Sequence, residues 1–315
     1  MAGKDHSGDD VNPESRTKGR MAGEKRRSPI VSGIFYPDSG ERIRSQLSSW
    51  GLADGSKEQL PVSSRRNAEP VFVSGGKIIL APHGAWNLTG NIAAAAFAAV
   101  QKTAGKTGKP VRRVLLLAAA HHFSEDGIYL SDSASFETPL GDLQVDMKFN
   151  RELENCSGLI RTNDIPHLLE HSLEVLLPMV KYCFPKVKIV PILMRGRNSG
   201  LMSALAGALK TALGKHLGES LVVLSSNISC HAAKAAARSM AEQFQTLLLE
   251  MDTAAYLDRL EASGISACGG ALAGALLQSG LLKGRNFSAL CPMVHGIGEK
   301  GEYFYYSALG CIQGE

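Results

Sequence analysis

Residues 114–122 read VLLLAAAHH, a continuous apolar run that ends on a pair of histidines. Two other runs have the same form: residues 78–83 read IILAPH, and residues 221–231 read LVVLSSNISCH. Continuous Val, Ile and Leu runs fit strands that are buried on both faces, as in sheets flanked by helices. The carboxyl ends of such strands face the crevice where ligands bind. Three strands that each end on histidine or on a Cys-His pair therefore predict a metal site at one edge of a sheet.

The composition is that of an ordinary globular protein. The chain has 315 residues, 44% of them hydrophobic, and a formal net charge of only +4 with dispersed basic residues, which disfavours nucleic acid or a membrane surface as a partner. The charged amino terminus lacks an apolar signal segment, so a cytoplasmic location is expected. Six scattered cysteines fit a reduced compartment better than a disulfide framework.

The domain organisation follows from a change in composition near residue 28. Residues 1–27 are rich in charged residues, Gly and Ser, and predict a disordered charged tail. Residues 28–315 alternate strand and helix signals, which predicts a single α/β domain with a mostly parallel or mixed central sheet and helices on both faces. Besides the three apolar runs, the expected strands are 127–131, 188–193, 287–294 and 303–312, and the expected helices are 41–50, one capped by 89–91, 168–182, 201–213, 232–251, 254–261 and 268–278.

His83 and the pair His121-His122 are the first candidate ligands. Pro82 ends strand pairing before His83, and Gly84 permits a tight turn after it. His83 alone also fits a hydrogen-bonded structural histidine. Adjacent strand residues point in opposite directions, so one member of the pair is expected to face the site while the other anchors the turn.

Cys268 precedes Gly269-Gly270 and an apolar helical run. A thiol at the amino terminus of a helix has a lowered pKa, which favours the thiolate that a metal or an electrophile needs. The alternative is a buried cysteine beside close-packed glycines.

Two further polar groups are candidate neighbours of this site. His171 and Glu174 are three residues apart at the start of a predicted helix and share one face, where they can ligate, orient or transfer a proton. Glu170 and Ser172 can instead serve as helix-capping groups. Residues 225–231 place hydroxyls, an amide, a thiol and an imidazole after one strand, more polar groups than a turn requires.

The order of these motifs resembles that of the Memo family, whose prokaryotic members are called AmmeMemoRadiSam system protein B. The resemblance covers nearly the whole ordered chain. The matching pieces are GIFYP at 33–37, APH at 81–83 with Gly90, HH at 121–122, EHSLE at 170–174 with LP at 177–178, SSN at 225–227 and CG at 268–269.

The resemblance implies a fold similar to that of class III extradiol dioxygenases, which are non-haem iron enzymes. It also implies one iron or copper ion per chain, held by two histidines and a cysteine that map to His83, His121 and Cys268. A thiolate ligand favours Cu(I) where that ion is available.

The chain departs from the family at the end of residues 221–231. Asn227 stands where the family has aspartate, and Cys230 stands where it has histidine, unless His231 substitutes after a slip of one residue. Losing a carboxylate removes a charged acceptor that would orient a histidine or stabilise a cation. Altered or lost chemistry is therefore expected here, with the metal site itself retained.

The preferred hypothesis is a Memo-family metalloprotein that oxidises a small organic substrate, with His122 or His171 as the candidate base. The alternatives are a non-catalytic module that binds a peptide or partner protein, and a protein that sequesters copper. The family name also suggests radical-SAM and AMMECR-type proteins as partners. The polar shell around the metal is expected to contain Glu170, Glu174, Asn227, Cys230 and His231.

Overall fold

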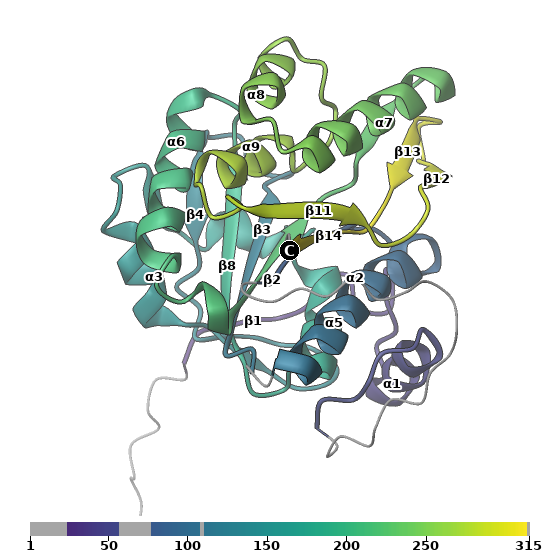
Figure 1. Cartoon of the computed structure of the whole chain (residues 1–315). Helices are drawn as coiled ribbons and strands as arrows, with labels where there is room; N and C mark the ends of the chain where they lie inside the picture. The colour runs from purple at the N-terminus through teal and green to yellow at the C-terminus, as the bar shows by residue number, and fades with distance from the viewer. Residues whose placement is uncertain (1–23, 57–76, 108–109, 314–315) are drawn as a thin grey trace, which may run out of the picture.

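The computed structural model describes residues 24–56, 77–107 and 110–313 and is built around a mixed sheet of eight strands (Figure 1). The three apolar runs form three adjacent strands of this sheet, in the spatial order β2, β9, β3, and they pair in parallel. In order across the sheet, the strands are β11 (Arg285–Ala289), β14 (Leu309–Gln313), β2 (Lys77–Ala81), β9 (Ser220–Ser225), β3 (Arg113–Ala119), β8 (Lys188–Arg195), β4 (Gly127–Leu130) and β7 (Ile160–Thr162).

Both kinds of strand pairing occur in this sheet. Strand β8 continues the parallel set beside β3, whereas β14 and β4 run antiparallel to β2 and β8 on either side of it. The prediction of a single α/β domain with a mixed central sheet is confirmed. Because β2, β9, β3 and β8 are parallel, their carboxyl ends all lie at one edge of the sheet.

Helices cover both faces of the sheet (Figure 1). On one face lie α3 (Met147–Glu154), α6 (Ser199–Ala208), α7 (Lys234–Glu250), α8 (Thr253–Glu261) and α9 (Gly270–Gln278). On the other face lie α1 (Gly40–Ser49), α2 (Trp86–Thr107) and α5 (Leu177–Cys183). Among the described helices, none combines the length and the apolar composition that crossing a membrane requires.

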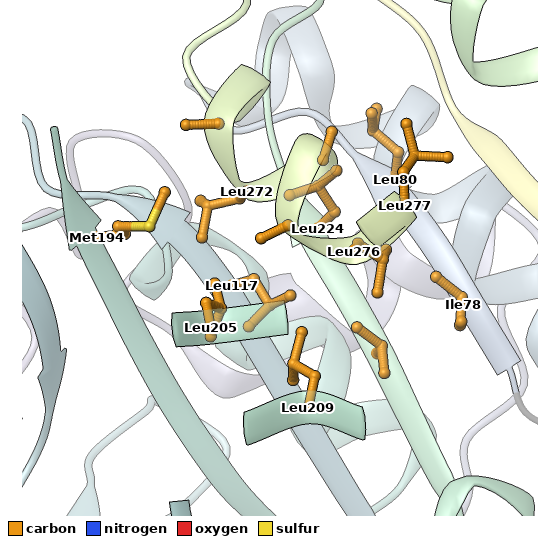
Figure 2. Close-up of a cluster of buried hydrophobic side chains, with 14 of the residues drawn as sticks. Ile78, Leu80, Leu117, Met194, Leu205, Leu209, Leu224, Leu272, Leu276 and Leu277 are labelled. Atoms are coloured by element: carbon orange, nitrogen blue, oxygen red, sulfur yellow. The ribbon is translucent and has the colours of Figure 1, made fainter. Parts of the chain in front are cut away.

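Alternate residues of each central strand supply the two cores. Leu80 and Leu224 point toward the face that α9 covers, where they meet Leu276 and Leu277 (Figure 2). Ile79 and the other residues that alternate with these along the strands point to the opposite face, against α2 and α5. Strands that are buried on both faces lack a polar side, which explains the unbroken apolar runs in the sequence.

Shorter elements complete the fold. One small sheet has the order β10 (Ser229–His231), β13 (Tyr303–Tyr306), β12 (Val294–Ile297), and another has the order β1 (Arg26–Arg27), β5 (Ser135–Phe136), β6 (Leu143–Gln144). The short helical turns are α4 (Ile165–Leu168), η1 (Glu174–Leu176), η2 (Leu209–Leu213) and η3 (Leu217–Glu219).

The structure corrects several predicted boundaries. The segments predicted as single strands over 287–294 and 303–312 are each divided between two strands, β11 and β12 for the first and β13 and β14 for the second. Residues 1–23 of the predicted disordered tail lie outside the described residues. Strand β1, however, falls within the predicted tail, and Arg27 is buried because its guanidinium pairs with the carboxylate of Glu174. The helix predicted over 168–182 is divided into α4, η1 and α5, with an irregular segment between α4 and η1. Helix α2 begins at Trp86, before the predicted cap at residues 89–91.

Candidate functional site

His83, His121 and Cys268 come together at the carboxyl edge of the central sheet. Each histidine follows the end of its strand by two residues, β2 for His83 and β3 for His121, and Cys268 lies just before α9. One ligand atom from each residue can be chosen so that all three lie within 4.8 Å of one another. The Sγ atom of Cys268 is 3.3 Å from Nε2 of His83. The three residues selected from the sequence therefore lie close together in the fold.

The His83 ring is held in one orientation by Ser225, the last residue of β9. The Ser225 hydroxyl donates to the carbonyl oxygen of Ser172 at 2.6 Å, so its single proton is already used. It must therefore accept the hydrogen bond from Nδ1 of His83, at 2.8 Å. This bond turns Nε2, the other ring nitrogen, toward Cys268.

Glu170 plays the same part for His121. Its carboxylate accepts hydrogen bonds from Nδ1 of His121 at 3.0 Å and from the backbone N–H of His121 at 2.5 Å. Only 1% of the Glu170 side chain is exposed. Although burial opposes ionisation, the bonds to His121 and to the Ser172 backbone hold the pKa of Glu170 well below its usual range. Glu170 therefore fixes the His121 ring while its own charge is retained.

Cys268 is placed to be a thiolate. Burial alone would raise the pKa of the thiol, but the charge of His83 and hydrogen bonds from His121 and His83 outweigh it, so the pKa lies well below its usual value. The backbone N–H of Asn227 also donates to Sγ at 3.1 Å. The reverse effect appears on His121: burial lowers its pKa, yet hydrogen bonds with Cys268 and Glu170 raise it to about 10.

His171 extends the cluster of imidazole rings. Its ring centroid lies 5.8 Å from that of His83 and 5.5 Å from that of His121, and Nδ1 of His171 is 3.5 Å from the Glu170 carboxylate. Together with His121 and Glu170, it forms a second set of possible metal-binding side chains. Burial and the nearby charge of His83 lower the pKa of His171 to about 4, so the ring is neutral at pH 7.

His122 is exposed, and its ring contacts that of His171 at a centroid distance of 5.9 Å. His121 thus belongs to the cluster, and His122 lies at its rim.

The polar segment after β9 supplies some of the predicted shell. The Asn227 side-chain oxygen accepts from the backbone N–H of His83 at 3.3 Å, so the amide supports the loop that carries this ligand. Cys230 and Cys268 line one cavity. Burial and the charge of Glu302 raise the pKa of the Cys230 thiol, which therefore stays protonated at pH 7.

The structure contradicts the proposed shell role of His231. This residue is exposed, and its Nδ1 atom accepts from the backbone N–H of Ala233 at 2.9 Å. Successive residues of β10 point in opposite directions, so Cys230 faces the cavity and His231 turns away from it. The one-residue slip that would substitute His231 for Cys230 does not occur.

Glu174 is also absent from the shell. Its carboxylate pairs with the Arg27 guanidinium and accepts hydrogen bonds from the backbone N–H groups of Ile30 and Val31 and from the hydroxyl of Tyr36. These partners belong to the amino-terminal segment of the domain. Sequence spacing placed Glu174 on one helix face with His171, but the segment between them is not a regular helix, so the two side chains diverge.

Sequence reasoning missed two arginines beside the site. A cavity of about 560 Å³ adjoins the cluster, and its lining includes His121, Cys268, Arg195 and Arg197. Arg195 is the last residue of β8, the strand beside β3, and Arg197 follows two residues later. The signal that could have identified them is the same strand-end position that selected His83 and His121.

A family model and two relatives match most of this chain. A family model described as Memo-like protein matches residues 27–293. A protein of Nitrosopumilus maritimus described as a MEMO1 family protein is 25% identical over 291 residues, which are 92% of this chain and 94% of that protein. Another, from Methanobrevibacter smithii, is 28% identical over 77% of this chain and 83% of its own length. The crystal structure of the uncharacterized protein JW3007 from Escherichia coli K12 has a TM-score of 0.46 and 16% identity, over 75% of this chain and 99% of that one.

Proposed function

Because this chain belongs to the Memo family, we propose that it is a metal-binding member, with one iron or copper ion held by His83, His121 and Cys268. The observation that carries the proposal is the convergence of three donor atoms from two strand ends and one helix start. The names of the relatives mention no metal, so the proposed site is inferred from the side chains of this chain alone.

The donor set fits a transition metal. Two imidazole Nε2 atoms and a thiolate are the N and S ligands that iron, copper and zinc accept. Nδ1 of His83 is bonded to Ser225, and Nδ1 of His121 is bonded to Glu170, which is the second set of contacts that metal-binding histidines usually have. Three protein ligands leave further coordination positions for a substrate.

The same site supports a metal-dependent oxidoreductase as the finer proposal. A bound iron or copper ion would supply one-electron chemistry and polarise a ligand beside it. The residues of the chain would orient the substrate in the adjoining cavity and accept its proton. His171 is the preferred base because its ring adjoins both His83 and His121, whereas His122 contacts the cluster only through His171.

Metal analysis of protein purified without an affinity tag tests the first step. We expect about one iron or copper per chain, or uptake of one Fe(II) or Cu(I) on anaerobic titration. His83→Ala and Cys268→Ser should each abolish binding. His231→Ala and Cys156→Ser are matched controls, because these exposed residues lie outside the cluster. Failure of the unaltered chain to take up either ion would reject the proposal.

Oxygen uptake with catechol-type substrates tests the second step. Turnover that requires the bound metal and falls in His171→Ala would support an oxidoreductase. A chain that binds copper tightly without turnover would instead favour copper sequestration. The radical-SAM and AMMECR-type partners stay predictions that this measurement does not address.

A further inference from the structure

The cavity beside the cluster has the size of a site for a small organic molecule. Its volume of about 560 Å³ lies within the range of roughly 300 to 1,000 Å³ that is typical of ligand pockets. Cys268 and His121 form part of its wall, so a molecule in the cavity would lie against the proposed metal ligands. The other lining residues therefore decide which kind of small molecule the cavity can bind.

Positive charge dominates the charged side chains of this wall. They are Arg195, Arg197, Asp126 and, when protonated, His121. Within the described part of the chain, no carboxylate oxygen lies within 4.0 Å of either arginine. Two guanidiniums against one carboxylate leave a surplus of positive charge beside the cluster.

The two arginines differ in how much of their hydrogen-bonding capacity the protein uses. Arg197 donates from Nη1 to the carbonyl oxygen of Ile265 at 2.8 Å and from Nη2 to that of Ala267 at 3.4 Å, so it secures the loop that precedes Cys268. Among the residues that the structure describes, Arg195 makes a single long contact, of 3.5 Å, with the carbonyl oxygen of Ala120. A guanidinium has five N–H donors in a planar fork that matches a carboxylate. Arg195 is therefore the group with donors to spare.

Apolar side chains line another part of the cavity. Met194, Leu272 and Phe304 contribute to the wall, together with the small residues Ala119, Ala120 and Ala271. These surfaces stabilise a hydrocarbon body by removing it from water. The wall thus combines a cationic group, an apolar surface and an edge formed by the His-His-Cys cluster.

We propose that this cavity binds a small organic carboxylate with an apolar body, with its carboxylate on Arg195 and its body against Met194, Leu272 and Phe304. This proposal rests on the proposed function only for the part of the wall that His121 and Cys268 form, where the bound molecule would meet the metal site. Arg195 is in this view the residue that selects anionic over neutral substrates of the same shape.

Binding of benzoate and of its neutral counterpart benzamide tests the proposal. Titration calorimetry with the full chain should show benzoate binding at least about tenfold tighter than benzamide. Arg195→Gln should weaken benzoate binding about tenfold and leave benzamide binding unchanged, because a charge-assisted hydrogen bond contributes about that factor. Arg112→Gln is the control. This exposed arginine lies just before the amino end of β3, away from the cavity, and it pairs with Glu219.

A second variant predicts the opposite change. Asp126→Asn removes the only carboxylate among the lining residues of the cavity and should tighten benzoate binding by roughly twofold to fivefold. Equal affinity for benzoate and benzamide, or an unaltered benzoate affinity in Arg195→Gln, would overturn the proposal. So would failure of benzoate to bind at all.

The measurement separates this proposal from the proposed metal site. Calorimetry is done on protein treated with a chelator and on protein loaded with metal. Benzoate binding that depends on Arg195 in a chain that takes up no metal would reject the metal site alone. Metal uptake without selective benzoate binding would reject the carboxylate pocket alone.

Discussion

The hydroxyl oxygen of Ser225 lies 2.8 Å from Nδ1 of His83, although the two residues are 142 positions apart in the chain. They meet because β9 and β2 are parallel neighbours whose last residues, Ser225 and Ala81, are paired. Since the Ser225 proton is donated to Ser172, this contact fixes which nitrogen of His83 faces Cys268. The orientation of a proposed ligand thus depends on a serine from another strand.

Replacing Ser225 by alanine should weaken metal binding without abolishing it. The His83 ring would lose its acceptor and sample other orientations, and loss of such a contact typically costs about 10-fold to 100-fold in metal affinity. Competition with a chromophoric chelator measures this affinity. Ser220→Ala is the control, because Ser220 is a buried serine at the start of the same strand whose hydroxyl bonds to the His216 carbonyl. Equal effects of the two variants would contradict the orienting role.

Glu170→Gln should lower the pKa of His121. The carboxylate is one of the two groups that raise this pKa to about 10, and Cys268 remains in the variant, so we expect a decrease of about one unit or more. NMR titration of the His121 ring in metal-free protein measures the change. Glu219→Gln alters an exposed carboxylate next to Arg112 and should leave the His121 titration as it is. An unaltered pKa in Glu170→Gln would show that the carboxylate does not act on this ring.

Arg27→Met should destabilise the domain by about 3 to 5 kcal/mol, the usual cost of leaving one member of a buried ion pair alone. The side chains of Arg27 and Glu174 are only 2% and 1% exposed, and Arg27 also donates to the carbonyl oxygens of His167 and Glu170. Urea unfolding measures the loss. The neighbouring Arg26 is 59% exposed in its side chain, so Arg26→Met should cost less than about 1 kcal/mol.

A second substitution checks the reason for this loss. Adding Glu174→Gln to Arg27→Met removes the unpaired charge and should recover part of the stability. Loss of stability that is equal in Arg26→Met and Arg27→Met would contradict the buried-pair explanation.

His167 should make the domain less stable as the pH falls from about 6.5 to about 4. Burial lowers the pKa of His167 to about 4, while an exposed histidine in the unfolded chain titrates near its usual value of about 6.5. Above pH 6.5 the ring is neutral in both states. Between these values only the unfolded state takes up the proton, which favours unfolding by up to about 3 kcal/mol.

The unfolding free energies of the native chain and of His167→Gln at pH 7.5 and pH 4.5 test this effect. Glutamine keeps a donor for the Tyr129 carbonyl oxygen, which Nε2 of His167 contacts at 3.2 Å, but it does not titrate. The variant should lose less stability between the two pH values than the native chain. An equal loss would show that other groups account for the acid sensitivity.

The accuracy of the sequence predictions varied with how local the deciding interactions were. Strands β2, β3 and β9 were predicted because burial on both faces leaves an apolar signal in each run. The break between α4 and η1 was not predicted, because the apolar residues keep helical spacing through this segment. The break is associated with Glu170 and Glu174, whose carboxylates bind His121 and Arg27 from distant parts of the chain. Arg27 looked like part of a charged tail because its partner Glu174 lies 147 residues away.

The sequence by itself determined the α/β class, the strand ends and the family, and it nominated His83, His121 and Cys268, because these depend on short patterns along the chain. Only the tertiary structure decided that Ser225 orients His83, that Glu174 secures the amino-terminal segment, that His231 turns away, and that Arg195 lines the cavity. Side-chain partners depend on which strands are neighbours and which way each residue faces. Those relations are fixed when distant segments pack together, so no single segment contains them.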